Sequence, residues 1–306
     1  MPNTSSPPAS IDRFVEVEDG LRVWTRSLGG GAPDAATPLL ILHGGPGVPH
    51  DYLENLEALA SPRQRVVFYD QLGCGKSDRP DDPARWQLPR FVAEIDTVRT
   101  ALGLERAVLL GQSWGGMLAI EYMLGRPAGI DGLVLSNTTP SAPLFEKEAR
   151  RLLTLLPDAV QETIRRCEAE HAFLSAEYQA AMMVYYARHV VRVQPMPDFV
   201  QRSFLGVGQP YFVMWGKSEF TVTGNLRDWD RTARLGEIDS PVLLISGEHD
   251  ESTPLVNKVL QDGIRGARWH LMPGCSHFCH VEAPEAYREL VVGFLTSLTS
   301  RKASPP

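Results

Sequence analysis

One pattern constrains this chain more than any other feature: G-x-S-x-G at residues 111–115, with Ser113 at its centre. The apolar run 107–110 precedes the pattern and predicts a buried strand, and residues 117–124 come after it and predict a helix. A serine on so sharp a strand-to-helix turn stands clear of the backbone, at the positive end of the helix. The pattern predicts that Ser113 is a nucleophile, and a chance serine in a glycine-rich turn is the weaker interpretation.

A serine hydroxyl needs a base to remove its proton, and the base needs a carboxylate to orient it. Both residue types occur directly after later predicted strands: Asp250 follows the run 241–246, and His277 follows the run 267–272. The order Ser, Asp, His along the chain is that of the α/β-hydrolases. We therefore predict a catalytic triad of Ser113, Asp250 and His277.

Four neighbours of the predicted base and carboxylate are of a type that can replace them: His249, His280, Glu248 and Glu251. His280 falls where the final helix is predicted to begin, which favours a packing role. The turn position after residues 246–247 favours Asp250 over both glutamates.

The run 275–280 contains two cysteines and two histidines, which are possible metal ligands. A zinc site there would leave Ser113 and Asp250 without a role, and the cysteine spacing is not that of a C-x2-C pair. We predict no metal and no cofactor.

Acyl transfer also requires hydrogen-bond donors directed at the developing oxyanion. The run His-Gly-Gly-Pro-Gly at 43–47 follows the predicted strand 38–42, where lipase-type enzymes carry their oxyanion loop. We predict the backbone N–H groups of Gly45 and Trp114 as the donors. A serine in place of an aspartate at the centre of the pattern favours hydrolysis of an ester, amide, peptide or lactone.

Composition limits the possible partners. The net charge is −7 and no basic run is present, which argues against nucleic acid as a partner. No apolar run reaches the length that crosses a bilayer, and the N-terminus lacks the pattern of a secretory signal. Four cysteines in 306 residues do not indicate a disulfide framework, so we expect a reduced, cytoplasmic enzyme. Nothing in the sequence indicates an oligomeric state.

The alternation of strands and helices predicts an α/β fold with an eight-stranded, mostly parallel sheet, as in α/β-hydrolases. We assign residues 11–139 and 237–300 to this core and expect residues 1–10 to be disordered. Residues 140–236 are rich in helical pattern and lack buried-strand runs, so we assign them to a mostly helical cap domain.

The sequence resembles the proline iminopeptidases (prolyl aminopeptidases), with the related tricorn-interacting aminopeptidases and L-amino acid amide hydrolases. The resemblance extends from about residue 14 to residue 298. Its most specific parts are the runs 43–47, 70–77, 111–116 and 247–251 and the cap segment 211–230.

This resemblance implies release of an N-terminal residue, proline or another L-residue, from a small peptide or amino acid amide through an acyl-enzyme. It also implies that two carboxylates, at Glu219 and Glu251, hold the free amine of the substrate. Lys217 departs from the family, which usually has proline there, so an aminopeptidase or amidase for bulkier residues stays open.

Two other classes of function stay open. An esterase or lactonase would need only the triad and the oxyanion loop, but Glu219 and Glu251 would then face an uncharged acyl group without a cation. A non-catalytic receptor would keep the pocket, but it would not need an intact set of Ser113, Asp250 and His277.

Overall fold

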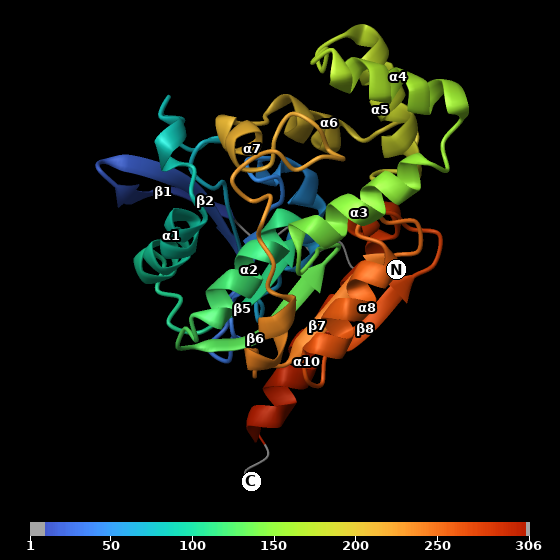
Figure 1. The fold of residues 1–306 in the computed structure, drawn as a ribbon. Helices are drawn as coiled ribbons and strands as arrows, with labels where there is room; N and C mark the ends of the chain where they lie inside the picture. Colours follow the sequence, from blue (N-terminus) through green and yellow to red (C-terminus); the bar gives the residue numbers. More distant parts are fainter. Residues whose placement is uncertain (1–9, 304–306) are drawn as a thin grey trace.

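The structure is a computed structural model that describes residues 10–303 (Figure 1). The predicted disorder of residues 1–10 falls outside the described residues, except for Ser10, which is the first residue of a strand.

Eight strands form one sheet in the order β1-β2-β4-β3-β5-β6-β7-β8. Their bounds are β1 (Ser10–Glu18), β2 (Leu21–Leu28), β3 (Leu39–Leu42), β4 (Val66–Tyr69), β5 (Ala107–Gln112), β6 (Ile130–Ser136), β7 (Val242–Gly247) and β8 (Arg268–Met272). β2 runs antiparallel to both β1 and β4, and the five remaining pairs are parallel. The predicted eight-stranded, mostly parallel sheet is confirmed.

Local sequence explains both the hairpin of β1 and β2 and the buried central strands. Asp19 and Gly20 join β1 to β2 with positive φ angles of 48° and 77°, which Asp and Gly tolerate in a tight hairpin turn. The central strands β3 and β4 are buried along their whole length, as their unbroken apolar runs predict.

Helices cover both faces of this sheet (Figure 1). On one face α1, α2, η3 and α8 contact one another in turn, and on the other η1, α9 and α10 do so. Their bounds are η1 (His50–Leu59), η2 (Pro83–Arg85), α1 (Leu88–Ala101), α2 (Trp114–Leu124), η3 (Thr232–Glu237), α8 (Pro254–Gly263), α9 (Cys279–Glu282) and α10 (Pro284–Ala303). The sequence pattern of residues 51–60 predicts a helix, and the structure has a 3₁₀ helix there, η1.

Five α-helices lie between β6 and η3, and this segment contributes no strand to the sheet: α3 (Ala142–Leu153), α4 (Asp158–Ala169), α5 (Ala176–His189), α6 (Asp198–Leu205) and α7 (Gln209–Met214). Figure 1 shows α4 and α5 standing away from the sheet. The segment leaves and re-enters the core at one place, where Ser141 pairs with Asp230 and the Ala142 N–H donates to the Trp229 carbonyl at 2.9 Å.

The three predicted triad residues all come after the carboxyl ends of parallel strands. Ser113 follows β5, Asp250 follows β7 and His277 follows β8. Because these ends lie along one edge of the sheet, the topology brings the three residues together. In the described part of the chain, no helix is both long enough and apolar enough to cross a membrane.

Candidate active site

Ser113 sits on a strained turn between β5 and α2, with φ 55° and ψ −124°. The two flanking glycines are required by space. A Cβ on Gly115 would collide with the Leu42 carbonyl at the end of β3, and a Cβ on Gly111 would collide with the Gly115 carbonyl. The strand and the helix can therefore meet closely enough to make this turn only without side chains at both positions.

Asp250 and His277 are joined by a hydrogen bond of 2.7 Å between Oδ1 and Nδ1, and both side chains are buried. The same carboxylate accepts the Ser252 backbone N–H at 2.8 Å and the Asn137 amide at 2.7 Å. These donors hold Asp250 in one orientation. The ring of His277 is thereby fixed with Nδ1 bonded to Asp250, which leaves Nε2 unused by the aspartate.

His277 and Ser113 line the same cavity. Within the described residues the Ser113 hydroxyl makes no hydrogen bond, and Nε2 of His277 lies 3.7 Å from Oε1 of Glu251. In proteins without substrate the contact between nucleophile and base is often long and tightens on binding. The arrangement allows the two groups to meet across the cavity.

Three of the four alternatives, His280, His249 and Glu248, lie outside this cavity, whereas Glu251 lines it and faces Nε2 of His277 rather than the Nδ1 that Asp250 holds. The ring of His280 contacts the Tyr52 carbonyl through Nε2 at 3.0 Å, and burial lowers the pKa of His280 to about 3. The side chain of His249 is 40% exposed. Glu248 accepts the Gly274 backbone N–H at 2.9 Å and is 52% exposed, so neither lies in the cavity of Ser113.

The run 43–47 lies directly against Ser113. A Cβ on Gly44 would come within 3.0 Å of the Ser113 Cβ, and Gly45 lines the same cavities as the serine. The Gly45 N–H donates to none of the described residues, and Trp114 is the first residue of α2, where a helix leaves its N–H groups unpaired. Both donors are therefore available for a ligand beside Ser113.

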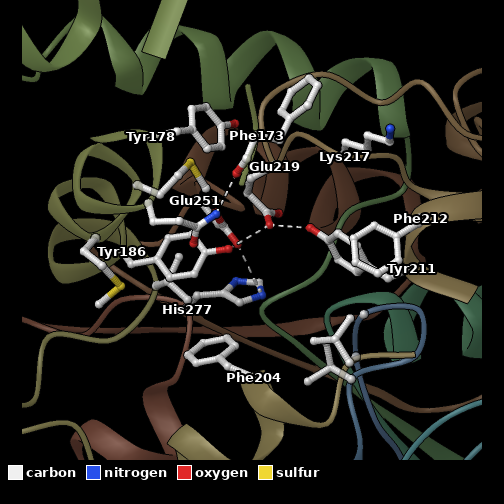
Figure 2. Close-up of a pocket in the computed structure, with 18 of the residues that line it drawn as sticks. Phe173, Tyr178, Tyr186, Phe204, Tyr211, Phe212, Lys217, Glu219, Glu251 and His277 are labelled. Carbon is white, nitrogen blue, oxygen red and sulfur yellow. Dashed lines mark hydrogen bonds and ion pairs between the residues drawn. The ribbon is translucent and has the colours of Figure 1, made fainter. Parts of the chain in front are cut away.

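Glu219 and Glu251 meet in the cavity above His277, although they come from the loop after α7 and from the turn after β7 (Figure 2). Oε2 of Glu219 accepts hydrogen bonds from Tyr211 at 2.7 Å and from Tyr186 at 3.2 Å. Oε2 of Glu251 is buried and has no hydrogen-bond partner among the described residues. Within the same part of the chain, neither glutamate forms an ion pair with Lys or Arg.

The electrostatics of this pair are unfavourable without a ligand. Burial raises the pKa of the Glu219 carboxyl. Burial, together with the negative charges of Glu219 and Asp250, raises the pKa of Glu251 well above its ordinary value. A cation placed between the two carboxylates would relieve both the desolvation and the repulsion.

Two cavities open beside Ser113, and both are also lined by Gly45, Glu219 and Glu251. The larger has a volume of about 780 Å³ and is bounded mainly by α5, α7 and the loop between α4 and α5. The smaller has a volume of about 20 Å³ and lies against the start of α2 and the end of β6.

One group of described residues has the spacing of metal ligands: His43, Asp70 and Cys74, all buried. Their ligand atoms are already engaged. Nε2 of His43 accepts the Gln71 N–H at 2.9 Å, and Asp70 accepts the N–H groups of His50 and Lys76, each at 2.9 Å. This group supports the loop that carries Gly45 and is a poor fit for a metal.

Two residues that position the site were not predicted from the sequence. Asn137 bonds to Asp250 and, at 3.1 Å, to the Ser276 carbonyl. Gln112 donates to the His277 carbonyl at 3.3 Å. Asn137 directly follows the carboxyl end of β6, so its place after a buried strand is the signal that could have identified it.

Residues 37–284 match the family described as alpha/beta hydrolase fold. A proline iminopeptidase of Heyndrickxia coagulans is 41% identical over 264 residues, which cover 86% of this chain and 91% of that protein. The crystal structure of proline iminopeptidase from Mycobacterium smegmatis is 38% identical with a TM-score of 0.87, and the match covers 94% of this chain and 98% of that one. The crystal structure of VinJ is 37% identical with a TM-score of 0.91, over 95% of this chain and 100% of that one.

Proposed function

Because this chain belongs to the proline iminopeptidase family of the α/β-hydrolase fold, we propose that it is a serine hydrolase that releases the N-terminal amino acid, proline or another L-residue, from a small peptide or an amino acid amide. The cytoplasmic location remains a prediction from the sequence. We also propose that residues 140–236 act as a cap that shapes the substrate cavity over the core.

Ser113 is the nucleophile in this proposal, His277 the base and Asp250 the residue that orients it. The Ser113 hydroxyl attacks the first carbonyl of the substrate while Nε2 of His277 takes its proton. His277 then gives this proton to the leaving nitrogen, which departs and leaves an acyl-enzyme. A water molecule, deprotonated by His277, attacks the ester and releases the amino acid.

Each tetrahedral intermediate carries a negative oxygen. The backbone N–H groups of Gly45 and Trp114 bind this oxygen in the proposal. Their lack of competing hydrogen bonds within the described residues and their position beside Ser113 support the assignment.

The unpartnered, buried carboxylate oxygen of Glu251, next to Glu219 in the cavity of Ser113, is the observation that carries the proposed substrate class. A buried acceptor without a partner is costly, and two carboxylates without a cation are more so. The protonated α-amine of a substrate supplies both the hydrogen bonds and the charge. Its capture there sets the first carbonyl at Ser113, so that a single residue is removed.

An esterase or lactonase is the second candidate, because the triad and oxyanion donors suffice for it. It leaves the buried pair of glutamates without a function, and no observation in the site favours it. An acyl group without charge would keep the desolvation of Glu251 uncompensated.

The test compares L-prolinamide and L-alaninamide with their N-acetyl forms, in the wild type and in Glu219→Gln and Glu251→Gln. We expect the free amines to be strongly preferred, and each substitution to lower kcat/KM for them roughly ten- to a hundredfold, the value of a charge-assisted hydrogen bond. Glu248→Gln, an exposed acid in the same turn, is the matched control. Equal rates on free and acetylated substrates would instead support the esterase or lactonase.

A further inference from the structure

The two cavities beside Ser113 differ greatly in volume. The larger measures about 780 Å³ and the smaller about 20 Å³. Roughly 10–15 Å³ is needed to hold one water molecule, so the smaller cavity has room for little more than a methyl group, whereas the larger matches sites for drug-sized ligands.

The position of His277 shows which side of the scissile bond enters which cavity. The leaving nitrogen must receive its proton from Nε2 of His277, so the leaving group has to lie on the His277 side of Ser113. His277 lines the large cavity and does not line the small one. The leaving group therefore enters the large cavity, and the side chain of the N-terminal residue faces the small one.

The wall of the large cavity is mainly apolar. Six apolar or aromatic side chains from the loop between α4 and α5, from α5, from α6 and from α7 make up much of it: Phe173, Leu174, Met182, Met183, Phe204 and Phe212. The ionisable groups Glu219, Glu251 and His277 lie close together, as Figure 2 shows. His171 and Lys217 also line the cavity.

Three of these apolar side chains are exposed to solvent when the cavity is empty. The exposed fractions are 92% for Leu174, 45% for Met183 and 51% for Phe212. A cluster of exposed apolar side chains that is continuous with a catalytic cavity marks a surface that an apolar ligand covers. Ammonia, the leaving group of a simple amide, would contact none of this surface.

Building on the proposed function, we infer that the preferred substrate is an aminoacyl amide whose leaving group is large and apolar. The amine lies between Glu219 and Glu251, the first carbonyl lies at Ser113, and the apolar group fills the cavity beneath α5 and α7. Such a leaving group is either a bulky hydrocarbon amine or a hydrophobic peptide, which share this chemistry.

The test is a series of L-alanyl amides made from methylamine, butylamine and octylamine, each with its N-acetyl form. The basicity of the n-alkyl amines is nearly constant, so the intrinsic reactivity of the amide does not change along the series. Each fully buried methylene contributes roughly three- to fourfold to binding, and we expect kcat/KM to rise at least tenfold from butyl to octyl. An amine of the octyl length with ether oxygens in its chain should lose this gain.

Two substitutions connect the gain to the cavity. Leu174→Ser and Met183→Ser should each lower the ratio of kcat/KM for the octylamide to kcat/KM for the methylamide severalfold. Leu155→Ser is the matched control, because Leu155 is also an exposed leucine, 58% accessible, but lies outside the cavity. Alanyl-leucyl-leucinamide then identifies the source: faster cleavage of this peptide points to hydrophobic peptides, and faster cleavage of the octylamide to hydrocarbon amines.

The possible outcomes distinguish a failure of the apolar leaving group from a failure of the proposed aminopeptidase activity. Equal kcat/KM for methyl, butyl and octyl amides, with N-acetyl forms inert, would overturn the apolar leaving group and leave the aminopeptidase intact. Cleavage of N-acetyl forms as fast as free amines would overturn the aminopeptidase itself. An equal loss on the octylamide in Leu155→Ser would also count against the assigned cavity.

Discussion

Nε2 of His277 lies 3.7 Å from Oε1 of Glu251, so the nitrogen that must take the serine proton faces a carboxyl in the free protein. Glu251 thus has two neighbours that matter for catalysis, the base on one side and Glu219 on the other. A substrate ammonium bound between the glutamates would form an ion pair with the Glu251 carboxylate, the same group that faces Nε2 of His277. Amine recognition and the state of the base are therefore linked through one side chain.

The first prediction concerns pH. The pKa values of Glu219 and Glu251 are raised, mainly by burial, and only their ionised forms attract an ammonium. As the pH falls through these raised pKa values, both carboxyls gain protons, so kcat/KM for L-alaninamide should fall. Glu219→Gln removes a negative charge that raises the pKa of Glu251, and its acid limb should therefore move to lower pH.

The comparison substrate for this measurement is an N-acetylalanine ester, which has no amine and reports on His277 without the glutamates. Identical acid limbs for amine and ester substrates, or an acid limb that moves to higher pH in Glu219→Gln, would contradict the role of the pair.

The second prediction concerns the triad as a unit. Ser113→Ala and His277→Ala should each lower kcat by at least about a thousandfold, and the double variant should be little worse than either alone. His280→Ala should have a mild effect on kcat, because its ring contacts Tyr52 rather than the cavity. A His280 variant that keeps its fold but is more damaged than the His277 variant would show that the base is wrongly assigned.

The third prediction concerns Asn137, a positioning residue. Its amide donates to Asp250 at 2.7 Å, and its φ of 51° suits Asn or Gly. Asn137→Gly keeps the backbone and removes the donor. We expect kcat to fall roughly ten- to a hundredfold, as for other hydrogen bonds to charged groups, with KM nearly unchanged because the glutamates are untouched. A raised KM with intact kcat, or a loss explained by unfolding in a thermal melt, would argue against positioning.

Residues directly after strand ends were predictable from the sequence. Ser113, Asp250 and His277 each come shortly after an apolar run, and parallel topology places such positions at one edge, so local pattern was sufficient to bring them together. The hairpin at Asp19 and Gly20 was equally local, because two residues that accept positive φ stand between alternating strands.

Contacts between distant segments were not predictable in this way. Nothing in the sequence near Glu219 indicates that the hydroxyls of Tyr186 and Tyr211 converge on it, because that depends on how α5 packs against the loop after α7. The unequal cavities arise from the same packing. The spacing of apolar residues also could not predict that η1 is a 3₁₀ helix, because the spacing at 51–60 resembles that of an α-helix.

The fourth prediction concerns the small cavity. Phe145 and Trp215 line it, with ring centroids 5.2 Å apart in an edge-on arrangement. Small N-terminal residues such as alanine should therefore be preferred over phenylalanine. Phe145→Leu enlarges the cavity, and we expect the ratio of kcat/KM for L-phenylalaninamide to that for L-alaninamide to rise about tenfold. An unchanged ratio in a folded variant would mean that the N-terminal side chain lies elsewhere.

The last prediction concerns stability. Glu251 has a raised pKa in the folded protein, whereas in the unfolded chain its pKa is about 4.3. Below that pH the carboxyl is neutral in both states and costs nothing. As the pH rises, the unfolded chain loses the proton first, so the free energy of unfolding falls until the pH passes the raised value in the folded state. The cost of Glu251 is therefore greatest at high pH.

Glu251→Gln should remove this cost while nearly preserving the shape of the side chain. Removing the unpartnered, buried negative charge is worth about 1–3 kcal/mol, which corresponds to a rise in Tm of roughly 2–10 °C at pH 8, together with the loss of amine recognition. At pH 4 the variant and the wild type should melt at nearly the same temperature. Glu289→Gln, on the exposed side of α10, is the control and should change Tm little at either pH. A Glu251 variant that is less stable than the wild type at pH 8 would mean that the carboxylate stabilises the fold, and that its strain does not serve substrate binding.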